Sequence, residues 1–211
     1  MEKSFWQEKW QANEIGFHQP IPHPLLEKYA SLIQAGERAH VFVPLCGKSV
    51  DMLRLGRDRV RVTGLELSHI AAKAFFTENQ IAMEIASEGE FERFRSDGIE
   101  ILCGDFFAVS AEQLGNVTAV YDRAALIALP PAMRGKYVRK LCSLLSGGEQ
   151  IFLIAIEYEE GLVNAPPFSV SDAEIHSLYQ DWGQIELLET REAEVKAQPC
   201  VERLFKIEVN R

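Results

Sequence analysis

Residues 40–49 read HVFVPLCGKS and residues 60–68 read VRVTGLELS. Each segment begins with a short apolar run, typical of a buried strand, and ends in a polar turn that leads into a predicted helix. The first turn contains Gly47, and the second run ends at Glu66. Strands that alternate with helices predict a parallel sheet with helices on both faces.

The same alternation continues outward from this stretch. Helices are predicted over residues 4–13, from 24 to about 35, and over 49–55, 68–79, 131–145 and 171–182. Seven strands are predicted, over residues 40–44, 60–67, 99–103, 117–122, 150–157, 185–191 and 203–209. The last two are separated only by a loop at about 192–202, which favours an antiparallel hairpin. We therefore expect an α/β fold with a seven-stranded, mostly parallel sheet and an antiparallel last strand, in a single domain over residues 1–211.

The composition excludes several classes of function. Lysine and arginine total 22 against 31 acidic residues, for a net charge of −9. Such a chain is a poor candidate for binding nucleic acid or an anionic membrane. The longest apolar run in the predicted strands, residues 151–156, is far shorter than the roughly 20 residues of a membrane span. The first residues carry charges where a signal peptide is apolar, so we expect a cytoplasmic protein.

The four cysteines, Cys46, Cys103, Cys142 and Cys200, lie far apart in the sequence. There is no CxxC pair and no spacing typical of a zinc site. We expect reduced, buried thiols and no metal.

Gly47 and Glu66 form the first candidate site. In an open α/β sheet, ligands bind beyond the carboxyl ends of the strands. Glu66 ends the second predicted strand 19 residues after Gly47, and a carboxylate at about this spacing can accept hydrogen bonds from both ribose hydroxyls. The alternatives are a solvated charge at the strand end or a cap for the next helix. Lys48 follows Gly47 as in a phosphate-binding P-loop, but that motif needs a second glycine where this chain has Phe42.

Two further strand ends carry polar residues. After the third strand, Gly104 and Asp105 precede Phe106; Asp105 could accept from an adenine amino group and Phe106 could stack on the ring. The alternative is a turn aspartate followed by core aromatics. After the fourth strand come Asp122 and Arg123, of which only one is expected to enter a given cleft; the alternative is an ion pair at the sheet edge.

These features together indicate a site for an adenosine compound. The glycines that seat a pyrophosphate are missing, which argues against NAD. An adenosine that carries a sulfonium amino acid needs the ribose carboxylate and the turn but no pyrophosphate seat. The residues therefore point to S-adenosylmethionine.

The sequence also resembles the thiopurine S-methyltransferase family, in its bacterial form, over nearly the whole chain. The segments that carry the resemblance are WxxxW at 6–10, GFHQ at 16–19, PLCGKS at 44–49, GLELS at 64–68 and DRAAL at 122–126. The resemblance implies a Rossmann-like class I methyltransferase fold with an N-terminal lid, residues 1–23.

The resemblance also implies roles for individual positions. The positions that match cofactor-binding residues are Trp10, Leu45, Glu66 and Arg123. Trp6 and the segment up to Phe17 match the lid, and Phe17 also matches a substrate contact. Gly104 and Asp105 match the loop on the adenine side, which varies within the family. Trp6 and Trp10 could alternatively be core aromatics that anchor a short terminal helix.

The expected reaction is in-line transfer of the methyl group to the sulfur of an aromatic or heterocyclic thiol, which leaves S-adenosylhomocysteine. Aromatic thiols are acidic, so we assign no general base. Arg123 could hold the methionyl carboxylate or neutralise an anionic heterocycle. We expect a monomer that acts on a small-molecule thiol. The alternatives are methylation of selenium or tellurium species in detoxification, and a regulatory module that binds adenosine compounds without turnover.

Overall fold

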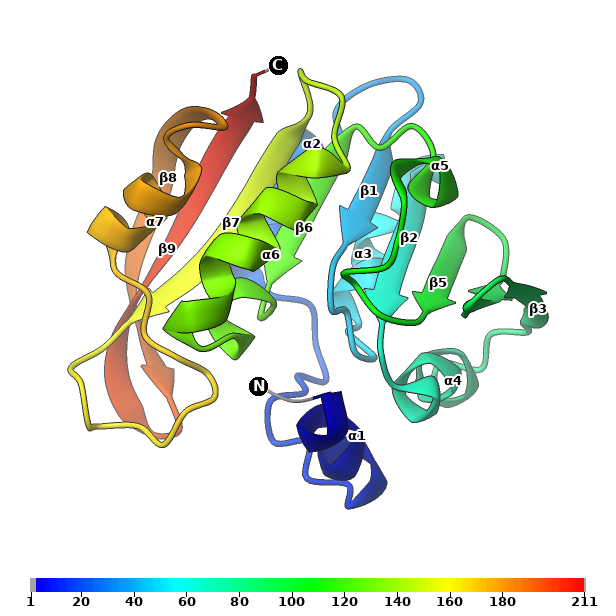
Figure 1. Ribbon diagram of the computed structural model, residues 1–211, viewed down its shortest axis with the longest axis horizontal. Coiled ribbons are helices and arrows are strands. Elements are labelled where there is room, and N and C mark those ends of the chain that lie inside the picture. Colours follow the sequence, from blue (N-terminus) through cyan, green and yellow to red (C-terminus); the bar gives the residue numbers. More distant parts are fainter. Residues whose placement is uncertain (1–2, 211) are drawn as a thin grey trace. The chain divides into compact units, whose positions relative to one another are not determined.

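The structure, a computed structural model, describes residues 3–210. The chain divides into two compact units, residues 1–118 and residues 119–211. Figure 1 shows the strands and helices of each unit.

The first unit contains the N-terminal helices and the strands that follow them. Its elements are α1 (Lys3–Gln11), α2 (Pro24–Ile33), β1 (His40–Val43), α3 (Asp51–Leu55), the 3₁₀ turn η1 (Arg57–Arg59), β2 (Arg61–Glu66), α4 (His69–Glu78), β3 (Glu84–Glu88), β4 (Phe91–Arg95), β5 (Ile99–Cys103) and α5 (Ala111–Leu114). Pro24 opens α2, as expected, and the preceding His23 caps this helix.

The parallel strands of the first unit end at one edge. The strands lie in the order β3-β4-β5-β2-β1, and both β1 and β5 run parallel to β2. Val43 pairs with Gly64, and Glu66 pairs with Cys103. The turns that follow β1, β2 and β5 therefore lie at the same edge. Figure 1 shows α1 beside α4 at this edge.

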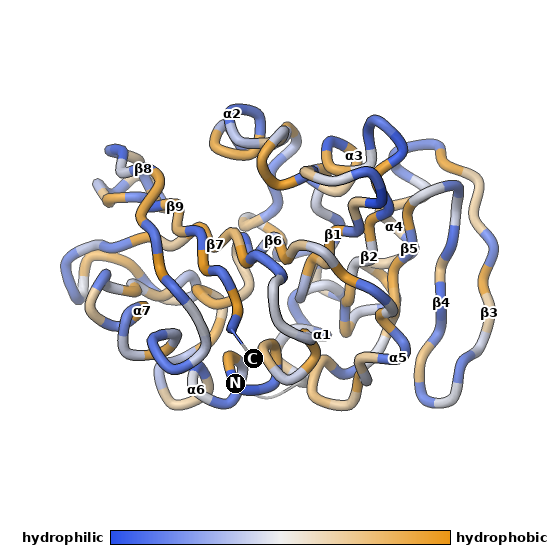
Figure 2. The backbone as a smooth tube through the Cα atoms, turned by 90° about the horizontal axis from the view of Figure 1, so that it is seen from above, coloured by the Kyte–Doolittle hydropathy of each residue, from blue (hydrophilic) through white to orange (hydrophobic). Residues whose placement is uncertain are grey.

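The hairpin of β3 and β4 was not expected. The described residues form nine strands where the sequence predicted seven, because residues 84–95 add an antiparallel pair. All but the last residue of β3 are exposed, so its sequence, EIASE, lacks the apolar run that indicates a covered strand. Figure 2 shows β3 and β4 side by side at the outer edge of this unit, with hydrophilic and hydrophobic residues mixed along both.

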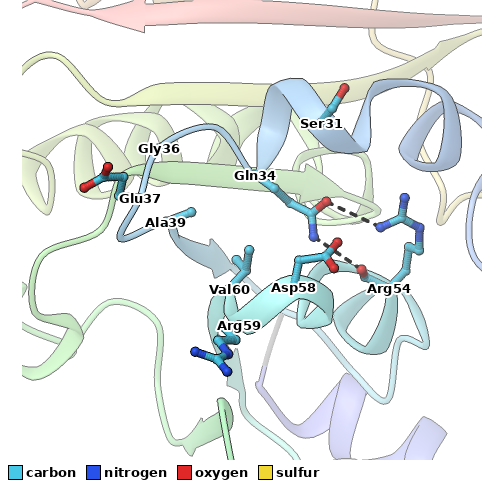
Figure 3. A pocket seen from close by; sticks show the side chains of 9 residues that line it. All are labelled: Ser31, Gln34, Gly36, Glu37, Ala39, Arg54, Asp58, Arg59 and Val60. Carbon is cyan, nitrogen blue, oxygen red and sulfur yellow. Dashed lines mark hydrogen bonds between the residues drawn. The ribbon is translucent and has the colours of Figure 1, made fainter.

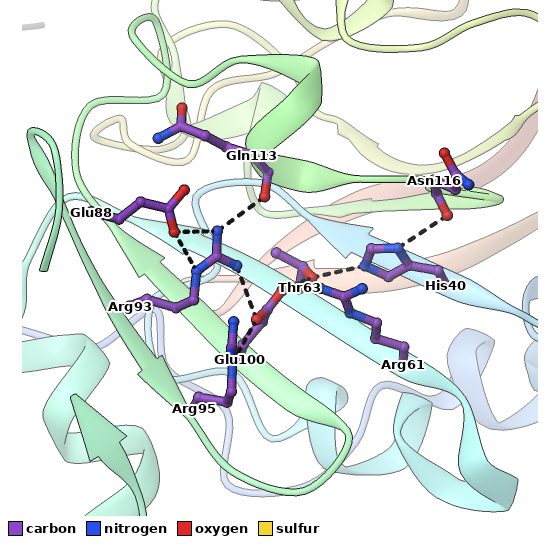
Figure 4. Close-up of polar contacts among 9 residues, drawn as sticks. All are labelled: His40, Arg61, Thr63, Glu88, Arg93, Arg95, Glu100, Gln113 and Asn116. Atoms are coloured by element: carbon purple, nitrogen blue, oxygen red, sulfur yellow. Dashed lines mark hydrogen bonds and ion pairs between the residues drawn. The ribbon is translucent and has the colours of Figure 1, made fainter. Parts of the chain in front are cut away.

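A buried ionic network joins this hairpin to the parallel strands (Figure 4). Glu100 on β5 is buried and pairs with Arg61, Arg93 and Arg95 at 2.7, 2.9 and 3.3 Å. The Thr63 hydroxyl donates to the same carboxylate at 2.9 Å. These donors outweigh the effect of burial and lower the pKa of Glu100 to about 2. Glu100 therefore stays ionised and ties β4 to β5 and β2.

The second unit contains the remaining strands. Its elements are β6 (Ala119–Arg123), the 3₁₀ turn η2 (Leu126–Ala128), α6 (Pro131–Ser143), β7 (Gln150–Glu157), α7 (Asp172–Tyr179), β8 (Gly183–Val195) and β9 (Gln198–Val209). They lie in the order β6-β7-β9-β8, with β6 parallel to β7 and β9 antiparallel to both of its neighbours. The predicted antiparallel hairpin at the end of the chain is confirmed.

The loop predicted in this hairpin is much shorter than expected. Only Lys196 and Ala197 separate β8 from β9, and both have positive φ, 50° and 59°. Two central residues with positive φ make the tight turn that matches strand twist, usually built from asparagine and glycine. Because neither residue is of that type, no local pattern indicates that both strands extend to the turn.

The thiols agree with the expectation from the sequence. All four cysteines are free and buried. Within residues 3–210, none of the helices has the length and the apolar character needed to cross a membrane.

Candidate functional site

The turn after β1 folds back toward the end of β2. Leu45 and Gly47 both have positive φ, 47° and 54°, which is unusual for leucine and readily adopted by glycine. The backbone N–H of Cys46 donates to the carbonyl of Leu65 at 2.9 Å. The turn is therefore fixed to β2 by a main-chain hydrogen bond.

Glu66 joins the glycine turn to the start of α4. Its Oε2 accepts from the N–H of Gly47 at 2.8 Å, and its Oε1 accepts from the N–H of Ser68 at 2.7 Å. Burial raises the pKa of this carboxyl, and the backbone donors oppose the rise. The backbone N–H of Leu67 is a third donor to this carboxylate, which has about four acceptor positions in all. The carboxylate supports the helix start, as one alternative held, and its role toward the ribose hydroxyls stays a prediction.

Trp10 covers the glycine turn. A side-chain carbon on Gly47 would lie 3.2 Å from Cζ2 of Trp10, so the indole rests on the backbone of the turn. Trp10 is buried, and Phe17 packs edge-on against both Trp10 and Trp6, with ring centroids 5.5 and 5.6 Å apart. Phe17 itself is 37% exposed. Trp6, Trp10 and Phe17 therefore pack together at the end of α1. Contacts of these rings with a ligand stay a prediction.

Close packing explains the glycine after β5. A side-chain carbon on Gly104 would lie 2.3 Å from the ring of Phe91 on β4, and the N–H of Gly104 donates to the carbonyl of Glu66 at 2.9 Å. The Asp105 carboxylate accepts from the N–H of Phe107 at 3.0 Å, and Phe106 is buried. These contacts fit the alternative of a turn aspartate followed by core aromatics. The adenine role of this segment stays a prediction.

The thiols near this edge are not activated. Burial and the Glu66 carboxylate raise the pKa of Cys46 well above its usual value and that of Cys103 to about 12. A protonated thiol is a weak nucleophile. In the part of the chain that the structure describes, no group of three histidine, cysteine, aspartate or glutamate side chains is arranged to hold a metal ion. The site offers an acceptor for hydroxyls and aromatic faces.

Arg123 ends β6 in the second unit and is partly exposed. The adjacent Asp122 is fully buried. The carboxylate of Asp122 accepts from the hydroxyl of Tyr137 at 2.7 Å and from the N–H of Leu126 at 3.1 Å.

Comparison with known families and proteins decides the class of protein. A family model described as "Thiopurine S-methyltransferase (TPMT)" matches residues 1–206. The chain belongs to the thiopurine S-methyltransferase family. A thiopurine S-methyltransferase of Pseudomonas putida (strain GB-1) is 40% identical over 98% of this chain and 99% of the relative. One of Pseudomonas fluorescens (strain SBW25) is 44% identical over 91% of this chain and 88% of the relative. The resemblance predicted from the motifs is confirmed, and the chain is a methyltransferase.

Solved structures confirm the predicted fold. Magnesium protoporphyrin IX methyltransferase from Synechocystis PCC 6803, solved with bound S-adenosylhomocysteine, has a TM-score of 0.67 at 13% identity over 98% of this chain and all of that chain. A 1,6-didemethyltoxoflavin-N1-methyltransferase of Burkholderia thailandensis has a TM-score of 0.67 at 12% identity over 99% of this chain and 87% of that chain. Both are methyltransferases, in agreement with the predicted class I methyltransferase fold of this family member.

The sequence analysis did not identify the buried carboxylate of Asp51, and it did not predict the hydrogen-bond partner of Asp122. Asp51 on α3 accepts from the N–H of His23 at 2.8 Å and so anchors the end of the predicted lid segment. Asp122 accepts from Tyr137 on α6. Neither pair could be found from sequence, because the partners lie 28 and 15 residues apart and neither spacing forms a motif.

Lys48 has a structural partner. Its ammonium group donates to both carboxylate oxygens of Glu78, the last residue of α4, at 2.8 and 2.7 Å. This pairing agrees with the sequence argument against a P-loop.

A separate cavity lies at the opposite edge of the first unit (Figure 3). Its volume is about 420 Å³, and its lining includes Ala39 and Val60, which precede β1 and β2. The Gln34 amide projects into it but donates to the carbonyl of Leu55 at 2.7 Å. The cavity is therefore far along the strands from the Gly47 turn, with which it shares no residue.

Proposed function

We propose that this chain transfers the methyl group of S-adenosylmethionine to the sulfur of aromatic and heterocyclic thiols, by direct in-line transfer. The observation that carries the proposal is the buried Glu66 carboxylate, which lies at the end of β2 and accepts from the N–H of Gly47 in the turn after β1. The family name and the identity of 40% to a thiopurine S-methyltransferase support the substrate class.

The first unit would hold the cofactor. Glu66 accepts from the ribose hydroxyls, while Leu45 and Gly47 form the turn along which the cofactor lies. Trp10 covers that turn, as its contact with Gly47 indicates. Gly104, Asp105 and Phe106 are proposed for the adenine side, because they follow β5 at the same edge.

The acceptor side relies on aromatic and cationic groups. Phe17 is exposed enough to meet a planar ring, and Trp6 packs on its edge. Arg123 is proposed to bind the methionyl carboxylate of the cofactor or the charge of an ionised heterocycle. The match to one family model over residues 1–206, which spans both units, supports a single catalytic domain. The monomeric state stays a prediction.

The protein contributes placement and electrostatics. Bound S-adenosylmethionine supplies an electrophilic methyl group on a sulfonium sulfur. Holding two reactants in attack geometry can account for about 7–11 kcal/mol of the barrier. An aryl thiol is ionised near neutral pH, so the residues need not remove its proton, and no general base is assigned.

An acceptor panel tests the proposal. Initial rates of labelled methyl transfer would be measured for aryl thiols and for the matching phenols and anilines, with and without a chelator. We expect transfer to the thiols alone, at a rate that the chelator leaves unchanged. Transfer to a selenol but to no thiol would establish the selenium alternative. Cofactor binding without transfer to any acceptor would establish the regulatory module.

A further inference from the structure

Asp122 is a buried carboxylate that the proposed reaction does not use. It directly precedes Arg123, and consecutive strand residues point to opposite faces. Asp122 is fully buried, whereas Arg123 is partly exposed. Because burying a carboxylate costs free energy unless its oxygens are hydrogen-bonded, its presence calls for a physical reason.

Both oxygens of Asp122 are bonded to groups of the second unit. Oδ1 accepts from the N–H of Leu126 at 3.1 Å, and Oδ2 accepts from the hydroxyl of Tyr137 at 2.7 Å. Leu126 is the first residue of η2, so this hydrogen bond closes a ring that contains the backbone of Arg123, Ala124 and Ala125. The ring is anchored to α6 through Tyr137.

The backbone inside this ring is in an unfavourable conformation. Ala124 has a φ of 65°, a left-handed value that costs an L-residue of order 1 kcal/mol or more. A strained turn persists only where its surroundings hold it. The hydrogen bond from Leu126 to Asp122 spans this turn, and the one from Tyr137 ties the residue before Arg123 to α6.

We propose that Asp122 is a positioning residue for methyl transfer: together with Tyr137 it fixes the turn that presents the Arg123 guanidinium. The inference rests on the proposed function, which assigns Arg123 to the cofactor or the acceptor. Asp122 itself touches neither reactant and acts through the backbone of its neighbour.

Tyr179 provides a matched comparison for Tyr137. Both tyrosines are fully buried, and this burial, together with the charge of Asp122, raises the pKa of each. The hydroxyl of Tyr137 donates to Asp122, whereas the hydroxyl of Tyr179 on α7 has no hydrogen-bond partner among residues 3–210. Phenylalanine substitution removes one buried hydroxyl in each case, but only one substitution removes a donor to Asp122.

The ionisation of Asp122 gives this restraint a pH signature. Burial raises the pKa of Asp122 to about 6, against the opposing effect of the Tyr137 hydroxyl and the backbone donors. Among residues 3–210, Tyr137 on α6 and Tyr179 on α7 interact electrostatically with Asp122, and Cys142 on α6 interacts with both tyrosines. Burial raises the pKa of all three groups, so they stay neutral near pH 6. Protonation of Asp122 weakens its bond to Leu126, and loss of the Tyr137 donor moves that protonation to higher pH.

A double-mutant cycle tests the inference. Tyr137→Phe would be made in the natural chain and in Arg123→Ala. For each variant, kcat/KM would be measured across pH with a nitrothiophenol and referred to the concentration of its thiolate form, so that ionisation of the acceptor does not contribute to the acidic limb. We expect Tyr137→Phe to lower kcat/KM roughly three- to tenfold, as loss of one hydrogen bond would, and to shift the acidic limb of the profile upward. In Arg123→Ala the same change should have almost no effect, and Tyr179→Phe should leave both rate and profile unchanged.

The affinity of the same variants for S-adenosylhomocysteine would also be measured by calorimetry, which requires no acceptor. If no thiol is methylated, the proposed function fails, while coupling between Tyr137 and Arg123 in this affinity still supports the positioning role. Equal losses from Tyr137→Phe with and without Arg123, in rate and in affinity, overturn it. If Tyr137→Phe does not fold, Asp122→Asn replaces it in the cycle; its pH profile should lack the acidic limb, and an unchanged limb overturns the inference.

Discussion

Glu66 shows how one side chain can serve both structure and binding. Its two oxygens already accept from the N–H groups of Gly47 and Ser68, so it shapes the turn and the helix that border the site. The same carboxylate is proposed to accept from the ribose hydroxyls. Replacement of the carboxylate therefore tests binding only if the fold is monitored at the same time.

Glu66→Gln should weaken S-adenosylhomocysteine binding by about 1–3 kcal/mol, because bonds to hydroxyls lose their charged acceptor. Calorimetry gives the affinity, and thermal unfolding shows whether the variant is folded. Glu78→Gln is the matched control, since Glu78 pairs with Lys48 at the end of α4. Unchanged affinity in folded Glu66→Gln would remove the ribose role.

Glu100 should make stability depend on pH at the acidic end. Its pKa is about 2 in the folded protein, below its ordinary value of 4.5. The lowered pKa contributes stability that is fully present above pH 4.5 and is lost as the pH falls toward 2. At about 1.4 kcal/mol per pKa unit, Glu100→Gln should cost on the order of 3 kcal/mol at neutral pH.

Denaturant unfolding at several pH values measures this cost. The difference between Glu100→Gln and the natural chain should shrink as the pH falls below 4.5. Glu90→Gln, in the exposed turn between β3 and β4, should change little at any pH. A cost for Glu100→Gln that stays constant down to pH 2 would contradict the network.

The helix α1 and the segment after it should respond to the cofactor. Trp10 rests on the Gly47 turn, and His23 is held by Asp51. Since the turn is where the cofactor is proposed to lie, binding should stabilise the packing of α1 upon it.

Limited proteolysis within residues 1–23 measures this response. We expect cleavage of the natural chain to slow when S-adenosylhomocysteine is added. In Trp10→Ala, cleavage should be faster and depend less on the ligand, because the contact with Gly47 is lost. Cleavage of the natural chain at one rate, with or without ligand, would count against a lid.

The elements that sequence predicted are those with a strong local signal. The strands β1 and β7 are apolar almost throughout, and both were found. The β3–β4 hairpin was missed because β3 is exposed, and the two-residue turn at Lys196 was missed because its residues do not favour positive φ. The local sequence pattern does not reveal a strand that is stabilised mainly by hydrogen bonds to its partner strand.

The site divides in the same way. Gly47 and Glu66 were found because their spacing along the chain reflects two adjacent strand ends. Asp51 was missed, and the partner of Asp122 was not predicted, because the groups that bond to these carboxylates come from distant segments. Phe106, proposed to stack on a base, proved to be buried, which sequence could not distinguish from an exposed ring.

The whole chain agrees with a small-molecule enzyme. Its net charge of −9 disfavours nucleic acid as a partner, and the family match extends over residues 1–206. The remaining question for the molecule as a whole is the atom that receives the methyl group. Heterocyclic thiols present a sulfur and ring nitrogens to the same site, so they allow the two acceptors to compete.

Carbon NMR of the product answers this question most directly. The protein would be incubated with a heterocyclic thiol and S-adenosylmethionine that carries a carbon-13 methyl group, because a methyl carbon on sulfur resonates well apart from one on nitrogen. The account predicts a single product with the label on sulfur, formed equally well in the presence of a chelator. A label on a ring nitrogen, or transfer to oxygen and nitrogen acceptors but to no thiol, would contradict it.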